Sequence, residues 1–371
     1  MKITVNKDNL LQILTHTQGV VDKRHSMPVL ANLLLEARNG ELEIIATDLE
    51  IGLKQKCEAQ VQEEGRASVS SRKLFEIVRE AGSDEVSIQT MENQWLEVSY
   101  GRSNFKLTGM DPAEHPGMPT PPDNGEKTST MEIDPGDLAE LIRKTIFAVS
   151  SDDTRSNLAG VYMVRGEKKG ILRTVATDGH RLAIVERKIK GEAPAEGIIM
   201  PRKGLSEVAK LLGEETEKVT ITVAGNEATF SLSACTFSMR LVEGTFPDYR
   251  QVVPKETPNL VGVGRDELLQ TIRRVSILSS ERARGIRLTL HAGSMNISAN
   301  NPDVGEARED VGVEYEGDEI EVGFNARYFL DVLAVLPEGS RVEIGLGDEL
   351  SPGVIRGDDP GYRYVVMPMR I

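Results

Sequence analysis

One pattern in this sequence occurs three times, and it limits the possible folds more than any other feature. A polar residue followed by apolar residues at helical spacing occurs near Asp8, Asp137 and Asp266. A second helical pattern follows each of these and begins at Ser71, Pro201 and Asn325. The repeat is far longer than the roughly 20–50 residues of a solenoid unit. It therefore predicts three similar globular domains, at residues 1–122, 129–247 and 253–371.

Each repeat divides again into two halves of similar pattern. In the first repeat, a short strand precedes each helix and three strand-like stretches follow it. Turn signals between strands occur at Asn39-Gly40 and Gly225-Asn226. We therefore predict an α+β fold in which each domain has two β-α-β-β-β halves, two helices and two small antiparallel sheets. Proline and glycine are concentrated at residues 110–128 and 244–259, which we interpret as stiff, packed linkers.

The composition is that of an ordinary globular protein, with 39% apolar and 27% charged residues. No apolar run reaches the roughly 18 residues of a membrane span, and the N-terminus lacks the apolar region of a secretory signal. Cys57 and Cys235 lie in equivalent-looking strands of different domains, so we expect two buried, free thiols in a reducing, cytoplasmic environment. The net charge of −14 argues against a nucleic-acid partner, but binding depends on where the lysines and arginines lie.

Three similar domains could build a ring. A domain of this size has a diameter of roughly 35 Å, and six touching spheres of that size leave a hole of roughly 35 Å. A nucleic-acid duplex, about 20 Å across, passes through such a hole with water to spare. Two chains joined head to tail would supply the six domains.

Basic residues lie off the apolar stripe of the predicted helices. They are Arg143, Lys144, Arg273 and Arg274 in two first helices, and Arg72, Lys73, Arg79, Arg202, Lys203 and Lys210 in two second helices. A single flank of this kind is typical of a solvated helix face, whereas its recurrence favours a positive lining for the hole. Such a lining attracts phosphates without reading bases, so DNA binding would be sequence-independent and salt-sensitive.

Four motifs, in this order and at these spacings, carry a resemblance to a known family. They are ATDGHRLA at 176–183, MPRKG at 200–204, FPDYR at 246–250 and YVVMPMRI at 364–371. Over essentially its whole length the chain resembles the β subunits of bacterial DNA polymerase III, the sliding clamps. The resemblance implies a homodimer that forms a six-domain ring around duplex DNA and holds no metal or cofactor. It also implies that the ring tethers the replicative polymerase and binds the clamp loader, other polymerases and repair proteins through a short peptide motif.

The resemblance places the peptide-binding pocket between the second and third domains. Its residues here are Leu158, Gly160, Thr177, His180, Arg181, Leu182, Pro247, Val252, Val365, Met367, Pro368, Met369 and Arg370. A chain end with two methionines suits several different peptides, because methionine side chains adapt their shape. Arg181 and Arg370 are expected to hold peptide carbonyls or carboxylates at the rim. The alternative for Met367 and Met369 is ordinary core packing.

Two loops correspond to DNA-contacting parts of the family. Arg24, with His25 beside it, matches a residue that touches DNA. The second loop is polar and aromatic in the family, whereas residues 150–157 here read SSDDTRSN. Asp152 and Asp153 repel phosphate, so we expect only Arg155 to contribute to DNA binding there.

For the dimer, the resemblance implies that edge strands of the first and third domains meet between two chains. Unpaired strand edges offer N–H and C=O groups that a partner can complete. We expect Phe105 and Leu107 to pack against Ile277 and Leu278. The charged rim would consist of Arg102 and Lys106 on one side and Glu306, Glu309 and Asp310 on the other, and it would orient the two faces.

The common catalytic patterns are missing from the sequence. No HExxH, CxxC, P-loop, GxSxG or EF-hand pattern occurs. Asp178 and His180 invite a catalytic reading, but Asp178-Gly179 is a turn signal and no nucleophile or third ligand is nearby in the sequence. We therefore expect a non-catalytic protein. A DNA clamp explains all these features together. A multidomain interaction scaffold leaves the basic flanks unexplained, and a hydrolase or isomerase explains least.

Overall fold

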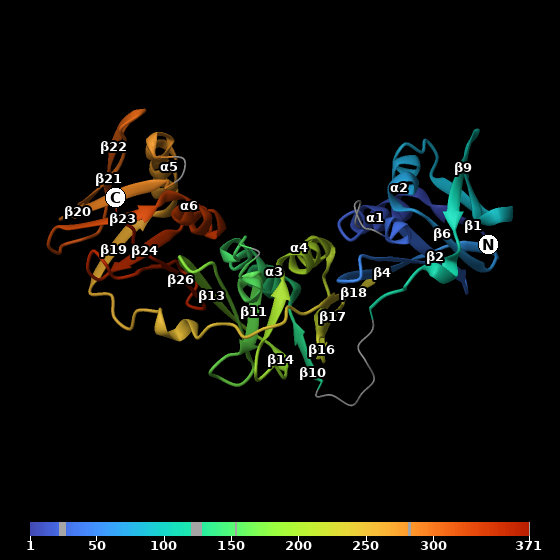
Figure 1. Ribbon diagram of the computed structural model, residues 1–371, viewed down its shortest axis with the longest axis horizontal. Helices are drawn as coiled ribbons and strands as arrows, with labels where there is room; N and C mark the ends of the chain where they lie inside the picture. The colour runs from blue at the N-terminus through green and yellow to red at the C-terminus, as the bar shows by residue number, and fades with distance from the viewer. Residues whose placement is uncertain (22–26, 120–127, 153, 281–282, 371) are drawn as a thin grey trace. The chain divides into compact units, whose positions relative to one another are not determined.

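The computed structural model describes residues 1–21, 27–119, 128–152, 154–280 and 283–370. Six α-helices in these residues lie where the repeated patterns predict them (Figure 1). They are α1 (Lys7–Thr17), α2 (Ser71–Arg79), α3 (Pro135–Arg143), α4 (Arg202–Leu211), α5 (Arg265–Val275) and α6 (Ala326–Val335). Each helix follows one strand and precedes three, so the predicted β-α-β-β-β half occurs six times in the described part of the chain.

The strands of the first predicted domain are β1 (Lys2–Asn6), β2 (Asn32–Arg38), β3 (Glu41–Thr47), β4 (Ile51–Glu58), β5 (Gln60–Glu63), β6 (Gly65–Ser70), β7 (Glu85–Thr90), β8 (Trp95–Tyr100) and β9 (Ser103–Met110). Those of the second are β10 (Ser129–Ile133), β11 (Gly160–Arg165), β12 (Ile171–Thr177), β13 (Arg181–Lys188), β14 (Lys190–Gly191), β15 (Ile198–Pro201), β16 (Val219–Ala224), β17 (Glu227–Ser231) and β18 (Cys235–Arg240). Those of the third are β19 (Asn259–Gly264), β20 (Gly285–His291), β21 (Ser294–Asn301), β22 (Gly305–Gly312), β23 (Ile320–Asn325), β24 (Arg341–Leu346), β25 (Gly353–Arg356) and β26 (Tyr362–Val366). The short strands β5 and β14 are additions to the sixfold pattern.

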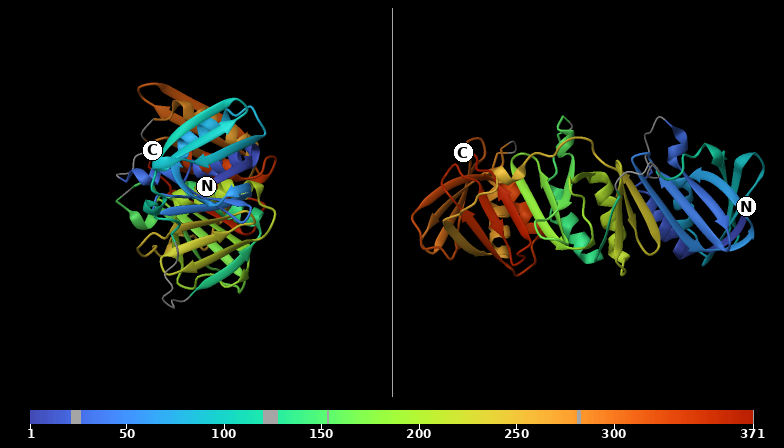
Figure 2. Two further views of the ribbon diagram at one scale, coloured as in Figure 1. Left: turned by 90° about the vertical axis from the view of Figure 1, so that its right-hand side faces the viewer. Right: turned by 90° about the horizontal axis from the view of Figure 1, so that it is seen from below.

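The helices form because an apolar stripe and a polar start signal coincide. The Asn6 side chain caps α1 by accepting hydrogen bonds from the backbone N–H groups of Asp8 and Asn9. The predicted stripes are buried, as Leu138 and Leu141 of α3 and Leu268 of α5 illustrate. Figure 2 shows the helices against the sheets from two further directions, and α1 contacts α2 just as α5 contacts α6. These four helices therefore pack in two pairs, α1 with α2 and α5 with α6.

The sheets are antiparallel and continue through the boundaries predicted between repeats. One has the order β14-β10-β16-β17-β18-β4-β3-β2-β6-β9-β8-β7-β1-β5, the second β15-β11-β12-β13-β26-β25-β24-β19, and the third β22-β21-β20-β23. The joins are the pairs β18–β4 and β13–β26. They arise because each of these strands would otherwise leave an edge with unsatisfied backbone groups.

The chain divides into two compact units. The first comprises residues 1–139, 189–194 and 200–242, and the second comprises residues 140–188, 195–199 and 243–371. The three-domain division remains a prediction. None of the helices formed by described residues is long and apolar enough to cross a membrane.

The predicted turn chemistry is present. Asn39 and Gly40 both have positive φ, 53° and 79°, as a type I′ hairpin between β2 and β3 requires. Gly225 begins the β16–β17 turn with φ 56°. In the turn after β12, Asp178 accepts a hydrogen bond from the His180 N–H at 2.9 Å. This turn role explains the Asp178-Gly179-His180 sequence without any catalytic function.

Candidate binding surfaces

The C-terminal tail, defined here as residues 367–370, is held between two segments that are distant in the sequence. It follows β26, which pairs with β13. The Met367 N–H donates to the His180 carbonyl at 2.9 Å, and the Met369 N–H donates to the Gly323 carbonyl at 2.8 Å. The first hydrogen bond places Met367 beside the turn that carries His180, and the second places Met369 beside β23.

The predicted peptide-binding residues form an accessible group and a buried group within the second compact unit. Exposed or half-buried residues are Thr177, His180, Pro247, Val252, Met367, Pro368, Met369 and Arg370. The buried ones are Leu158, Gly160, Arg181, Leu182 and Val365. Met367 is 36% exposed, which argues against ordinary core packing for that side chain.

The structure corrects the role predicted for Arg181. Its residue surface is only 7% exposed, so its guanidinium is not at a rim. Nε donates to Asp178 Oδ2 at 2.9 Å, Nη1 to Asp331 Oδ2 at 2.5 Å and Nη2 to the Phe147 carbonyl at 2.6 Å. Burial opposes its charge, but Tyr364 and the two carboxylates outweigh burial and raise the pKa of Arg181. The sequence motif contains Arg181 and Asp178 but gives no sign of the other two partners, because Asp331 and Phe147 lie far from Arg181 in the sequence.

Sequence reasoning missed Tyr328, which lies on α6. Its ring stacks on the His180 ring, with centroids 6.5 Å apart and an angle of 14°. The Tyr364 hydroxyl donates to the Tyr328 carbonyl at 3.0 Å and fixes this turn of the helix. The pattern of α6 gave no signal for this, since Tyr328 reads as one more residue of an amphipathic helix.

Most of the basic residues predicted to face DNA have acidic partners in the chain. The pairs are Arg72–Glu76, Lys73–Glu76, Arg79–Glu80, Arg155–Asp152, Lys203–Asp48, Lys210–Glu207 and Arg274–Glu309. Hydrogen bonds from Lys73 and Arg72 hold the pKa of Glu76 down at about 2. Arg202 is exposed and makes no ion pair with any described residue. Arg24 and His25, and Asp153 of the second loop, lie outside the described residues.

Lys144 is not a DNA-facing residue. Its side chain is 3% exposed, and Nζ lies 2.6 Å from Asp359 Oδ2 and 3.2 Å from Glu140 Oε2. Arg187 contacts the same two carboxylates. The position of Lys144 off the apolar stripe predicted solvent exposure, but Asp359 and the Tyr362 ring cover that flank. This lysine therefore stabilises the fold of the second unit.

The two strands predicted to form the dimer contact both have an unpaired edge among the described residues. In β9, Ser103–Tyr100 through Thr108–Trp95 pair with β8, whereas β6 reaches only Gly109 and Met110. In β22, all eight residues pair with β21 and none with another strand. Each edge thus offers free N–H and C=O groups.

An exposed apolar cluster lies beside β22. Ile277 is 76% exposed and Val304 65% exposed, although both are large aliphatic residues. Leu278 is half-buried, and its Cδ1 is 3.9 Å from where a Cβ would stand on Gly305. Val304 was missed in the sequence, where it is an isolated apolar residue in a polar turn. Phe105 and Leu107, the proposed partners on β9, are half-buried on one face, and Phe105 stacks on Tyr100.

The predicted charged rim is only partly available. Arg274 Nε donates to Glu309 Oε2 at 3.0 Å, so the Glu309 carboxylate already has a partner within the chain. Asp310 accepts a hydrogen bond from the Asn296 amide at 2.8 Å. Glu306 is exposed and makes no ion pair in the described part of the chain. The same is true of Arg102 and Lys106, the predicted rim residues of β9 and the turn before it. The prediction of the charged rim treated all three carboxylates alike, because pairing within the chain is not visible in a sequence pattern.

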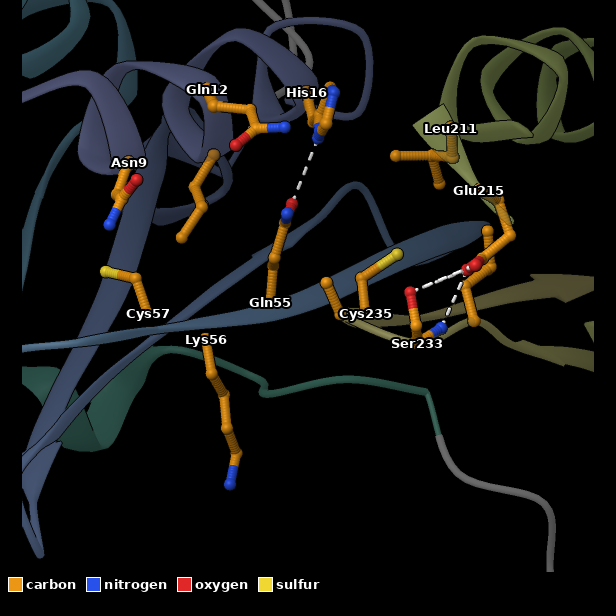
Figure 3. A pocket seen from close by; sticks show the side chains of 13 residues that line it. Asn9, Gln12, His16, Gln55, Lys56, Cys57, Leu211, Glu215, Ser233 and Cys235 are labelled. Atoms are coloured by element: carbon orange, nitrogen blue, oxygen red, sulfur yellow. Dashed lines mark hydrogen bonds between the residues drawn. The ribbon is translucent and has the colours of Figure 1, made fainter. Parts of the chain in front are cut away.

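A hollow of about 180 Å³ in the first unit is lined by α1, β4 and the turn before β18, and it contains both cysteines (Figure 3). Gln55 lies between them and accepts or donates a hydrogen bond at 3.0 Å with His16 Nδ1. Both cysteines are free thiols; Cys235 is buried as predicted, whereas Cys57 is only half-buried. Burial raises the pKa of Cys57 to about 11 and that of Cys235 to about 12. Such thiols are poor nucleophiles. No group of three or more metal-ligating side chains occurs among the described residues.

Comparison with known proteins gives a consistent result over the whole chain. Residues 1–119, 132–248 and 250–370 match the models of the N-terminal, central and C-terminal domains of the DNA polymerase III β subunit. The β sliding clamp of Caulobacter vibrioides is 34% identical, with all of both chains covered.

Solved structures agree with this result. A sliding clamp from Bartonella birtlesii bound to griselimycin has 31% identity and a TM-score of 0.93, with complete coverage of both chains. A β sliding clamp from C. crescentus, with polyethylene glycol bound to a putative tethering region for the β motif, has 34% identity, a TM-score of 0.91 and the same coverage. The chain therefore belongs to the DNA polymerase III β-subunit family, the β sliding clamps, which are non-catalytic subunits acting in DNA replication.

Proposed function

We propose that two copies of this chain close head to tail into a ring that encircles duplex DNA and slides along it. The observation that carries the proposal is the presence of two different unpaired strand edges, β9 in one unit and β22 in the other. Each chain has one edge of each kind. In a dimer, β9 of each chain pairs with β22 of the other, so the two contacts are equal and all four edges are paired. A closed dimer thereby removes the aggregation hazard that either edge poses alone.

The ring would hold DNA by enclosure, with weak attraction to phosphates. The helices carry exposed basic side chains, and most of these are paired with carboxylates, as Arg72 is with Glu76 and Arg79 with Glu80. Exposed ion pairs contribute only about 0–1 kcal/mol, so a passing phosphate can replace the carboxylate at little cost. Weak and exchangeable contacts of this kind permit sliding and carry no sequence information.

We further propose that the surface formed by the tail, the His180 turn and Tyr328 binds short peptide segments of the replicative polymerase, the clamp loader, and other polymerases and repair proteins. Accessible methionines beside an aromatic pair offer an adaptable apolar surface. The related clamp bound to griselimycin suggests a probe, and we expect griselimycin to bind this surface here. The proposed compartment is the bacterial cytoplasm, where these partners replicate DNA.

The experiment that tests enclosure compares circular with linear DNA. The protein is loaded onto a nicked circular plasmid by a clamp loader, isolated by gel filtration, and then the plasmid is cut once with a restriction enzyme. We expect the protein to remain with the circle and to leave after cutting, because free ends let a ring slide off. Equal retention on both forms would show binding by direct contact, and no retention on either form would favour an interaction scaffold over a clamp.

Removing basic charge from α4 should weaken the attraction to DNA. We expect Arg202→Ala with Lys203→Ala to lower the loading rate and to reduce the slope of log rate against log salt by about 2, since each phosphate contact contributes about 1. The matched control is Lys168→Ala with Lys169→Ala, which removes two exposed lysines from the β11–β12 turn. If both double variants load alike at every salt concentration, the flank of α4 does not attract DNA.

A further inference from the structure

Arg181 joins three segments of the second unit at a single buried guanidinium. Asp178 belongs to the turn between β12 and β13, Asp331 belongs to α6, and the Phe147 carbonyl belongs to a short 3-10 helix, Ile146–Ala148. The guanidinium also lies over the Tyr328 ring at 4.6 Å. Every nitrogen of the guanidinium therefore has a partner. The partners belong to three elements that are not adjacent in the sequence.

The same junction fixes the accessible residues above it. His180 precedes Arg181 directly, and its carbonyl accepts the hydrogen bond that begins the tail. Its ring stacks on Tyr328, which lies one helical turn before Asp331 on α6. A shift of α6 against the turn would therefore separate His180 from Tyr328 and move Met367.

We infer that Asp331 is a positioning residue for the peptide-binding surface: by holding Arg181 it keeps α6 in register with the turn that carries His180. The inference rests on the proposed peptide-binding function. Asp178 cannot do this work, because it lies three residues from Arg181 in the same turn and moves with it. Asp331 is the carboxylate that α6 supplies, and its side chain is 28% exposed.

Arginine makes this junction sensitive to the loss of one partner. A guanidinium stays charged at all relevant pH values, so it cannot relieve a lost contact by losing a proton. A buried charge with a missing partner is strongly unfavourable. Without Asp331 we expect Arg181 to turn towards water or towards Asp178, and in either case α6 loses its charged link to the turn. Arg327, whose Nε is 3.8 Å from Asp331, is 60% exposed and has water as an alternative partner.

The test is Asp331→Asn in the full-length chain, with fluorescently labelled griselimycin as the probe. We expect the affinity to fall roughly tenfold, since the neutral amide replaces the charged partner that α6 offers to Arg181. We also expect the methyl NMR signals of Met367 and Met369 in the free protein to shift, because their surroundings move. The matched control is Glu338→Gln, which removes an exposed carboxylate just after α6 and should leave affinity and signals unchanged.

The outcomes separate a positioning role from general stability. A folded Asp331→Asn variant that binds griselimycin with wild-type affinity, or that binds weakly with unmoved methionine signals, would overturn the inference. If that variant does not fold, Asp331→Glu decides: the charge is kept but displaced, so we expect a folded protein with shifted signals and weaker binding, and wild-type behaviour in both respects would count against positioning. Failure of the wild-type protein to bind griselimycin would instead refute the proposed peptide surface.

Discussion

Ile277→Asp combined with Leu278→Ser is expected to convert the proposed dimer into monomers. Burial of a large aliphatic side chain contributes about 1.5–3 kcal/mol, so the two residues together contribute about 3–6 kcal/mol to each contact. The proposed ring has two such contacts and both chains carry the substitutions, so the dimer loses about 6–12 kcal/mol and its dissociation constant rises roughly 10⁴–10⁹-fold. The aspartate adds a desolvation cost if the contact still forms. Sedimentation velocity at micromolar protein checks the result directly.

The variant should leave the monomer fold intact, because Ile277 is 76% exposed and packs little against its own chain. Leu350→Ser serves as the matched control. Leu350 is 69% exposed in a loop after β24, and its replacement removes a comparable apolar surface. That control should remain dimeric and should stay on circular DNA. A dimeric Ile277→Asp, Leu278→Ser protein with a normal melting temperature would mean that β22 does not form the proposed contact.

The helices and the sixfold pattern could be predicted from the sequence because local signals determine them. A capping residue such as Asn6 and a stripe such as Leu138 with Leu141 act within a few residues of each other. The Asn39-Gly40 turn was predictable for the same reason, since positive φ favours these two residue types. The joining of sheets through β18–β4 and β13–β26 was not predictable, because pairing between distant strands leaves no periodic trace.

The candidate sites were predicted less completely, and the failures share a cause. Lys144 looked exposed and Arg181 looked like a rim residue, but each is covered by carboxylates that lie more than 100 residues away. Glu309 was predicted to be a free acidic residue, but it forms an ion pair with Arg274. A charged residue in a sequence pattern has no visible partner, so a pattern overestimates how many charges are free to bind another molecule. Exposed apolar residues such as Ile277 were predicted through the resemblance and not through any physical signal.

Deletion of residues 367–371 is expected to abolish binding of griselimycin and of partner peptides while the proposed dimer persists. The deletion ends after Val366, so β26 keeps its pairing with β13 and β25. It removes both methionines of the accessible surface and the hydrogen bond that links the tail to the His180 carbonyl. Fluorescence anisotropy with labelled griselimycin measures binding, and sedimentation velocity measures the dimer. We expect no binding of the labelled griselimycin even when the protein concentration is about 100-fold above the dissociation constant of the wild type.

Two further variants locate the loss within the tail. Met367→Ala with Met369→Ala keeps the backbone hydrogen bonds to His180 and Gly323 but removes the apolar side chains. If the methionines provide the binding surface, this double variant should lose about as much affinity as the deletion, whereas a small loss would assign the binding energy to the backbone of the tail. Leu260→Ser, at an exposed apolar residue of β19, is the matched control and should bind normally. A deletion variant that also loses the dimer would mean that the tail supports the subunit contact, because β9 and β22 alone would then be insufficient to hold the two chains together.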